Sequence, residues 1–266
     1  MPDFIDQTGR KIYLDKTPEK IISVVPSLTE LLYDLGLDNE VAGITKFCVY
    51  PEKWFLTKTR IGGTKTLDIP HIHELHPDLV IANKEENVKE QVEELAAHYP
   101  VWISDINNLE DAYHAIGQIG DIVGKKGPAE SIIHDIKRNF TRLIIPKLKP
   151  KACYLIWRNP YMTVGGGTFI HSMLEEAGFE NVFKDRVRYP VVSLDDIAIR
   201  KPGWILLASE PFPFKEKHIE EMKAHLPGTK FLLADGEMFS WYGSRMIDHF
   251  FCEGNGHHVK NNVLNN

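Results

Sequence analysis

One long amphipathic stretch near the middle of the chain constrains its fold more than any other feature. Between Gly127 and Lys149, apolar residues recur at spacings of three and four, which places them on one stripe of a helix. Pro128 suits the first turn of such a helix, whereas Pro146 kinks its last turn and Lys149-Pro150 ends it. At a rise of about 1.5 Å per residue the stretch predicts a rod of roughly 30 Å, long enough to join two domains.

The sequences on the two sides of this stretch echo each other. Before it, Leu67-Asp68-Ile69 leads through a short helix to Pro77 and a buried strand. After it, Leu194-Asp195-Asp196 leads through a short helix to Pro202 and another buried strand. We therefore expect two similar α/β lobes joined by one helix. The predicted boundaries are 1–124 for the N-terminal lobe, 125–149 for the linking helix and 150–266 for the C-terminal lobe.

Each lobe shows an alternation of strands and helices. The run Ile21–Pro26 is a β-branched strand of the kind buried on both faces of a parallel sheet, and Ser27-Leu28-Thr29-Glu30 after it has the pattern of a capping box. The pattern predicts mostly parallel sheets, whose ligands bind beyond the carboxyl ends of the strands. Further strands are expected at 41–45, 77–82, 101–104, 152–157, 204–208 and 230–234, and helices at 85–98, 109–123, 168–177, 193–199, 215–225 and from 244.

Charge and composition exclude several classes of partner. A net charge of −6 and a pI near 6.1 argue against nucleic acid or an anionic membrane surface as the main partner. No apolar run approaches the length of a membrane span, and the first residues carry no secretory signal, so a trimmed exported form and a cytoplasmic protein both stay open. Cys48, Cys153 and Cys252 match no zinc or redox spacing; we expect buried thiols, with one disulfide as the alternative.

Aromatic residues outside the helical and strand periodicity mark a candidate ligand site. They fall in predicted loops at strand ends, which would bring them to the faces of the two lobes that look at each other. A cleft lined by rigid aromatic rings suits a large flat or partly apolar ligand. The alternative is that several of them close the ends of the lobes. The candidates are Phe47, Tyr50, Trp157, Tyr161, Tyr189, Trp241 and Tyr242.

Cations in the same loops could hold polar groups of such a ligand. Lys84, Arg158 and Arg245 could clamp carboxylates, amides or a phosphate, although exposed surface charge explains each of them equally simply. The histidines at 71, 73 and 76 indicate a solvated helix face rather than a metal site. The sequence contains no nucleophile elbow, zinc-protease motif or dinucleotide fingerprint, which favours a binding protein over an enzyme.

Several segments resemble one family. The pattern Pro26-Ser27-Leu28-Thr29-Glu30, the segments 75–81 and 165–183, and Val192-Ser193-Leu194-Asp195 resemble the ABC-transporter substrate-binding proteins for vitamin B12 and iron–siderophore complexes. The resemblance covers nearly the whole chain in the right order. It implies a class III periplasmic-binding-protein-like fold, with two α/β lobes joined by a rigid helix, the ligand held between them and little hinge closure. It also implies a monomer that is periplasmic or attached to a membrane.

Within that family, the cobalamin-binding proteins look nearest. Their corrin-contacting aromatics would fall at Phe47, Trp157 and Tyr189, with an acid and an arginine near Asp235 and Arg245. The sequence departs from them at two positions, where Thr64 and Asn83 replace tryptophans. The resemblance therefore implies a more polar N-terminal side of the cleft.

The family also docks on its permease through one acidic residue in each lobe. Asp195 matches the second of these acids. The position that matches the first is close to Pro70, so Asp68 is only a neighbouring substitute. N-capping of a helix is the alternative role for both acids.

Three hypotheses for function follow. The leading one is a receptor without an intrinsic cofactor that binds a corrinoid, an iron–siderophore complex or haem and delivers it to the permease of an ABC importer. The second is a cytoplasmic carrier of the same ligands, suggested by the missing signal. The third is a nitrogenase-like two-lobed enzyme, in which Cys48 or Cys153 would ligate a cluster or act as nucleophile.

Overall fold

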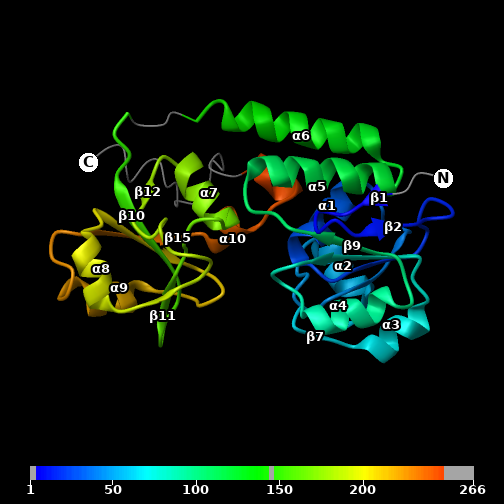
Figure 1. Cartoon of the computed structure of the whole chain (residues 1–266), viewed down its shortest axis with the longest axis horizontal. Helices are drawn as coiled ribbons and strands as arrows, with labels where there is room; N and C mark the ends of the chain where they lie inside the picture. Colours follow the sequence, from blue (N-terminus) through cyan, green and yellow to red (C-terminus); the bar gives the residue numbers. More distant parts are fainter. Residues whose placement is uncertain (1–3, 144–146, 249–266) are drawn as a thin grey trace. The chain divides into compact units, whose positions relative to one another are not determined.

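The computed structural model describes residues 4–143 and 147–248. The chain folds into two compact units; in Figure 1 the first is coloured from blue to green, with one late segment in orange-red, and the second from green to orange. The first unit contains the chain up to Ile106, then Glu110–Ile136, and also a short late segment, Tyr242–Ile247. The second contains Asn107–Leu109 and Lys137–Trp241. A C-terminal segment of the chain therefore returns to the first unit. The two units do not correspond to one cut between an N-terminal and a C-terminal half.

The first unit is built on a parallel sheet of five strands in the order β5-β4-β3-β8-β9. All residues of β3, β8 and β9 are buried, as expected for a sheet covered on both faces. Two small antiparallel hairpins, β1–β2 and β6–β7, complete the unit. The strands are β1 (Phe4–Ile5), β2 (Lys11–Ile12), β3 (Ile21–Ser23), β4 (Val41–Ile44), β5 (Thr59–Arg60), β6 (Gly62–Gly63), β7 (Thr66–Leu67), β8 (Leu79–Asn83) and β9 (Val101–Ser104). The helices are α1 (Pro26–Asp34), α2 (Glu52–Thr57), α3 (Ile69–Leu75), α4 (Lys89–Ala96), α5 (Leu109–Ile122) and α6 (Lys126–Phe140), with the 3₁₀ helix η1 (Ser244–Ile247).

The long helix predicted for 127–149 is shorter than expected. Helix α6 ends at Phe140; the amide of Thr141 still bonds four residues back, whereas those of Arg142 and Leu143 bond three residues back. Such tight bonds are common where a helix terminates. Pro146 follows in the sequence, and a proline disfavours helical backbone in the residue before it. The predicted rod is therefore a 15-residue helix, and its last residues, from Lys137 on, already belong to the second unit.

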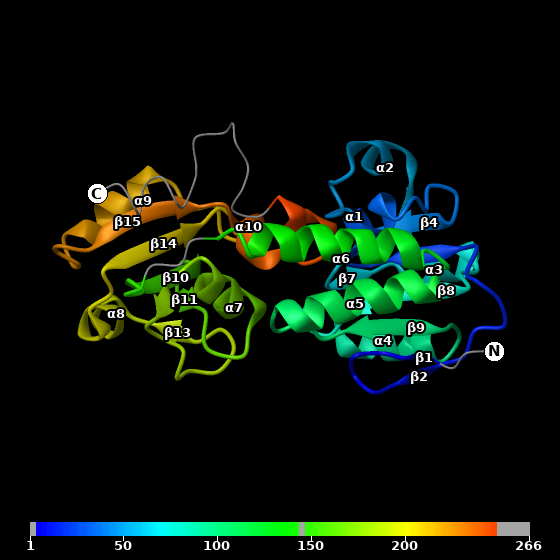
Figure 2. The same cartoon turned by 90° about the horizontal axis from the view of Figure 1, so that it is seen from above.

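Helix α6 packs closely on α5, and the two lie side by side in both Figure 1 and Figure 2. The buried face of α6 contains Ala129, Ile132, Ile136 and Phe140, which follow the predicted stripe. Gly120 of α5 is required for the contact, because a Cβ atom at this position would overlap the side chain of Ala129.

The second unit is built on a mixed sheet in the order β13-β11-β10-β14-β15, with β12 paired beside the start of β10. Strands β10, β12, β14 and β15 are parallel, whereas β11 runs antiparallel to β10 and β13. The strands are β10 (Lys151–Trp157), β11 (Tyr161–Thr163), β12 (Glu180–Asn181), β13 (Val191–Val192), β14 (Trp204–Ala208) and β15 (Lys230–Ala234). The helices are α7 (Phe169–Glu176), α8 (Leu194–Arg200), α9 (Glu216–Lys223) and α10 (Gly236–Ser240).

The echo in the sequence corresponds to a repeated structural element. Helices α3 and α8 have seven residues each, and each ends at a residue with left-handed backbone, His76 in one and Lys201 in the other. A proline follows in both copies, and each then enters a buried strand of five residues, β8 or β14.

The predicted capping box at Ser27 is wrong. Helix α1 begins one residue earlier, at Pro26, with Val25 as an N-cap that has no side-chain bond. Ser27 lies inside the first turn, buried, and its hydroxyl caps nothing. Proline at the first helical position explains the earlier start, because its backbone angle is already helical. Within the described parts of the chain, no helix has the length and apolar character needed to cross a membrane.

Candidate ligand-binding site

A network of buried amides shapes the loop after β8 in the first unit. The side-chain oxygen of Asn83 accepts hydrogen bonds from the backbone N–H groups of Glu85 (2.8 Å) and Glu86 (2.9 Å). Its side-chain nitrogen donates to the hydroxyl of Ser104 at the end of β9 (2.9 Å). Asn87 donates to the carbonyl oxygens of Val24 and Thr64, both at 3.1 Å. The loop is therefore fixed at the carboxyl ends of β3, β8 and β9.

This network changes the role expected for Thr64 and Asn83, the two positions at which the sequence departs from the cobalamin binders. Asn83 is only 2% exposed, so its amide contributes to the interior and not to a polar wall. Thr64 takes part through its backbone carbonyl oxygen. The polar groups that replace the tryptophans thus hold a loop, and the loop presents Lys84, Glu85 and Glu86.

Tyr242 ties the returning segment to the same loop. Its hydroxyl donates a 2.8 Å hydrogen bond to Oε1 of Glu86, and the tyrosine is buried. Burial is the main cause that raises the pKa of Tyr242 well above its usual value, and the Glu86 carboxylate raises it further. A phenol that keeps its proton is a permanent donor, so this bond persists across the physiological pH range.

Arg245, three residues later, forms a two-point ion pair with Glu30 of α1. Its Nε lies 2.7 Å from Oε2 and one terminal nitrogen lies 2.8 Å from Oε1. The guanidinium also lies over the ring of Tyr50, 4.4 Å from its centroid. Tyr50 follows β4 and is 43% exposed, whereas the ion pair is partly buried. We call Glu30, Tyr50 and Arg245 the edge triad.

The other candidates of the first unit lie in neighbouring loops. Phe47 follows β4 and is 51% exposed, with the ammonium of Lys46 over its ring. Lys84 forms an ion pair with Asp105 at 2.5 Å. The carboxyl edge of this sheet therefore combines exposed aromatic rings with cations that already have carboxylate partners.

In the second unit, Trp157 lies at the end of the central strand β10. It is 40% exposed, and the ring of Phe212 contacts it in a T-shaped arrangement, with the ring centroids 5.9 Å apart. Arg158 follows it and pairs with Glu221 of α9 at 2.5 Å. Phe212 is in turn packed on Phe214 and His218, so the exposed indole rests on an aromatic support.

Trp241 and Asp235 serve the local structure of the second unit. The indole nitrogen of Trp241 donates to Glu210 at 3.0 Å, and the side chain is buried. Asp235 is exposed and caps α10 by accepting a bond from the amide of Glu237. Trp241 and its neighbour Tyr242 are thus adjacent residues that bond to glutamates in different units. Both anchor the returning chain, a role that the sequence pattern did not indicate.

The remaining two aromatics are half-buried. Tyr161 is the first residue of β11 and packs against the hydrophobic core of the second unit, so it does not lie in the loop where the sequence placed it. The antiparallel strand β11 was missed because it has only three residues. Tyr189 lies between the left-handed residue Arg188 and strand β13.

The two proposed docking acids occupy different positions on their helices. Asp68 is the N-cap of α3 and accepts from the amide of His71. Asp195 is the second residue of α8, where Ser193 and Asp196 form the capping box. Both acids are exposed. Asp68 therefore corresponds to Ser193, whereas the counterpart of Asp195 in α3 is Pro70.

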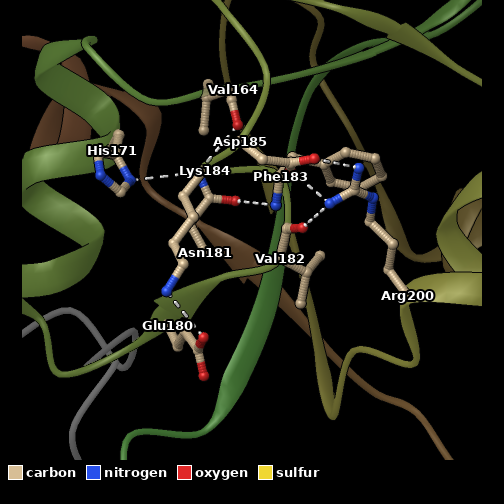
Figure 3. Close-up of polar contacts among 9 residues, drawn as sticks. All are labelled: Val164, His171, Glu180, Asn181, Val182, Phe183, Lys184, Asp185 and Arg200. Atoms are coloured by element: carbon tan, nitrogen blue, oxygen red, sulfur yellow. Dashed lines mark hydrogen bonds and ion pairs between the residues drawn. The ribbon is translucent and has the colours of Figure 1, made fainter.

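Arg200 fixes the other end of α8. Figure 3 shows its guanidinium bonded to Asp185, with a 2.9 Å contact to Oδ2, and to the carbonyl oxygen of Val182. The same group lies over the ring of Phe183, 4.5 Å from the centroid. The hydrogen bond from Arg200 is the main cause that lowers the pKa of Asp185. Nearby, the buried Asn181 donates to the carbonyl oxygen of Val164 and so fixes the chain beside β12.

Cysteine and metal chemistry gain no support from the described residues. Cys48 and Cys153 are buried free thiols, and burial raises the pKa of both, that of Cys153 to about 12. Cys252 lies outside the described residues. Among residues 4–143 and 147–248, no three His, Cys, Asp or Glu side chains are arranged to hold a metal ion.

Sequence reasoning missed the acids of the site. Glu30, Glu86, Glu210 and Glu221 each accept a bond from a predicted candidate. Glu30 lies in the first helix after the buried strand β3, and the sequence pattern was interpreted as part of a helix cap, whereas Arg245 was expected in the C-terminal lobe. Its position beyond the strand was the signal that could have found it.

Comparison with known proteins identifies the family. Residues 21–231 match the model of a family described as periplasmic binding protein. The uncharacterized ABC transporter substrate-binding lipoprotein YvrC of Bacillus subtilis is 26% identical over 208 residues, which cover 74% of this chain but only 65% of that protein. A vitamin B12-binding protein of Yersinia pestis is 26% identical over 195 residues, covering 71% of this chain and 69% of the relative.

The fold agrees with solved structures. A possible iron-binding periplasmic solute-binding protein of Staphylococcus epidermidis superposes with a TM-score of 0.74 at 23% identity, covering 88% of this chain and 96% of that one. This likeness confirms the predicted class III α/β fold. Because the family model spans most of the sequence, the chain belongs to the periplasmic binding protein family.

Proposed function

We propose that the protein is the substrate-binding component of an ABC importer and that its ligand is a large metal chelate, either a corrinoid or an iron chelate. The observation that carries this proposal is Trp157. It is an exposed indole at the carboxyl end of the central strand of its sheet, supported by Phe212. Open α/β sheets bind ligands at this edge, and a rigid exposed indole provides a stacking surface for a flat, partly apolar molecule.

Other side chains of the two carboxyl edges complete the proposed contacts. Phe47 and Tyr50 supply exposed rings in the first unit, and Tyr161 and Tyr189 supply half-buried rings in the second. Trp241 and Tyr242 are assigned to anchoring because they are buried and bonded to glutamates. The names of the relatives, one a vitamin B12-binding protein and one a possible iron-binding protein, support a chelate and leave its chemical class open.

We further propose that Asp68 and Asp195 contact the permease. Each is an exposed carboxylate in or beside the first turn of a helix, and these two helices belong to the repeated structural element. Asp68 caps its helix, whereas Asp195 makes no cap bond. The charge of Asp195 is therefore available to an arginine of a partner. In keeping with the lipoprotein named among the relatives, we place the protein at the outer face of a cytoplasmic membrane.

A ligand titration tests the proposal. Purified protein is titrated with cobalamin, cobinamide, haem and a ferric siderophore, following tryptophan fluorescence and the visible spectrum of the ligand. Saturable binding of one of them at micromolar concentration or below is expected, weakened in Trp157→Ala and unchanged in Tyr13→Ala, an exposed aromatic of the N-terminal hairpin. Absence of binding to all four would contradict the proposal.

The enzyme alternative has no specific observation in its favour. Its candidate nucleophiles, Cys48 and Cys153, are buried thiols with raised pKa values, the opposite of a reactive cysteine. The names of the relatives favour a receptor over a cytoplasmic carrier.

A further inference from the structure

His218 is a buried polar side chain within the aromatic support of Trp157. The centroid of its ring lies 5.3 Å from that of Phe212 and 5.6 Å from that of Phe214, and the two phenylalanine centroids are 4.7 Å apart. The three rings therefore contact one another, and His218 is only 4% exposed. Phe212 also contacts Trp157, with the ring centroids 5.9 Å apart. The position of the exposed indole thus depends on rings that His218 helps to hold.

A backbone bond connects this support to the strand that ends in Trp157. The amide of Phe212 donates to the carbonyl oxygen of Ile156 at 3.3 Å. Such a bond fixes the backbone of Phe212 but not the rotamer of its ring. The ring is held by its neighbours, and His218 is one of them. A change at His218 is therefore transmitted to the indole through the ring of Phe212.

The hydrogen bond of His218 defines its neutral form. Its Nδ1 accepts from the backbone N–H of Lys215, the residue before α9, at 2.9 Å. An acceptor nitrogen carries no proton, so the neutral ring carries its proton on Nε2. Protonation of Nδ1 would turn two N–H donors toward each other, and the Lys215 amide would lose its acceptor at the start of the helix.

The surroundings of His218 oppose its protonation. Burial is the main cause that lowers the pKa of His218, and the charge of Arg158 is the next. Lys217 and Lys215, at the start of α9, lower the pKa further, whereas Glu221 acts in the opposite direction. Glu221 is itself bonded to Arg158 at 2.5 Å. Because the folded-state pKa is the lower one, the folded protein takes up this proton only below about pH 6.5, and the proton then adds a second positive charge beside Arg158.

We propose that His218 is a positioning residue for the ligand-binding indole. In its neutral form it holds Phe212 against Trp157, and in its protonated form it releases that support, so that ligand affinity falls in mildly acid solution. The inference rests on the proposed function, because it concerns the ring assigned there to ligand stacking. It adds to that function a dependence on pH that originates within the second unit.

Fluorine NMR of protein labelled with 5-fluorotryptophan follows the indole without any ligand. The chain has five tryptophans, and the resonance of Trp157 is the one absent from Trp157→Phe. In the wild type this resonance should shift with pH, with a midpoint below about 6.5. In His218→Phe, which keeps a ring but takes up no proton, the shift should disappear. A shift that persists in His218→Phe, or a wild-type resonance that does not move between about pH 7.5 and pH 5, would overturn the inference.

Two further variants separate the His218 ring from its hydrogen bond. His218→Asn keeps an acceptor for the Lys215 amide but removes the ring, so the Trp157 resonance should be displaced at every pH. A resonance that titrates as in the wild type would refute the role of His218. His225→Asn is the matched control, because His225 is an exposed histidine beyond the other end of α9, and it should leave the titration unchanged. A thermal melt shows whether each variant is folded, and the titration of the wild type needs no variant.

Ligand affinity tests the consequence for binding. Cobalamin, cobinamide, haem and a ferric siderophore are each titrated at about pH 7.5 and pH 5. The affinity of the compound that binds should fall by about threefold to tenfold in the wild type and in His225→Asn, and by no more than about twofold in His218→Phe. Binding with the same pH dependence in the wild type and in His218→Phe would overturn the inference and leave the proposed function intact. If none of the four binds while the Trp157 resonance still follows His218, the proposed function fails and the role of His218 in affinity fails with it.

Discussion

The carboxyl ends of the two sheets are built from different side chains. In the first unit, the edge contains buried amides, a buried tyrosine hydroxyl and an arginine–glutamate pair, each of them hydrogen-bonded, beside the exposed rings of Phe47 and Tyr50. In the second, the edge is made of an exposed indole on an aromatic support. The difference teaches that two units with matching α/β elements can build the same edge in two ways: one edge is fixed by buried polar bonds, and the other presents a supported aromatic ring.

The largest expected effect concerns the stability of the polar edge. Asn83→Ala removes a buried amide that accepts from two backbone N–H groups and donates to Ser104, so both N–H groups lose their partner. We expect the free energy of unfolding to fall by about 2 to 4 kcal/mol. Asn181→Ala in the second unit should cost less, because the Asn181 oxygen accepts from one backbone N–H, that of Phe183. Urea unfolding of both variants measures the difference; an equal loss would show that the second backbone N–H bonded by Asn83 adds no stability.

The next effect concerns ligand affinity at the aromatic edge. Trp157→Ala should weaken ligand binding by about 5 to 30-fold, or about 1 to 2 kcal/mol, through loss of a stacking surface. Because the side chain is already 40% exposed, the free energy of unfolding should change much less than in Asn83→Ala. Trp157→Phe should keep part of the affinity. A variant that lost stability but not affinity would show that the indole closes the core and binds nothing.

One buried tyrosine in each unit should respond differently to substitution by phenylalanine, as measured by the free energy of unfolding. Tyr242 donates to Glu86, whereas the buried hydroxyl of Tyr154 on β10 has no hydrogen-bond partner in the described structure. Tyr242→Phe should therefore lower the free energy of unfolding by about 1 to 2 kcal/mol, and Tyr154→Phe should leave it unchanged or raise it by up to about 1 kcal/mol. Thermal or urea unfolding of the two variants provides the measurement. A larger loss from Tyr154→Phe would contradict the comparison.

The pH dependence of the same tyrosines follows from their pKa values. Burial raises the pKa of both hydroxyls well above the usual value, so the folded protein keeps these protons while the unfolded chain loses them near pH 10. The contribution of these two tyrosines to the free energy of unfolding is complete below about pH 10. It is lost as the pH rises through their folded-state pKa values. Wild-type stability should thus decline in alkali. The decline should be smaller when either tyrosine is replaced by phenylalanine, and an unchanged decline would exclude that tyrosine as its source.

The sequence predicted the parts of the fold whose physical cause is local. Short apolar runs located β9, β14 and β15 at the residues that the structure shows; β9 and β14 are buried throughout, and β15 only in part. Strands of two or three residues, such as β5 and β13, were missed because no periodicity is visible over so short a length. The site was only partly predictable. Arg245 and Trp157 could be named, but the partner of Arg245 lies 215 positions away and no local pattern records such a pairing.

The smallest expected effect concerns the two copies of the repeated element. Helix α8 begins with a reciprocal capping box between Ser193 and Asp196, whereas α3 relies on one 3.2 Å bond from the amide of His71 to Asp68. Ser193→Ala should lower the free energy of unfolding by about 1 kcal/mol and Asp68→Ala by roughly half of that, the lower part of the usual range for caps.

The capping box of α8 should also depend on pH. The backbone bond from Ser193 is the main cause that lowers the pKa of Asp196. The stability due to this box is therefore present above the usual pKa of an aspartate and is lost as the pH falls through the lower folded-state value. Urea unfolding at neutral and acidic pH measures both caps. If Asp68→Ala costs as much as Ser193→Ala, the cap is the main role of Asp68. A small cost together with loss of transport would instead support its proposed contact with the permease.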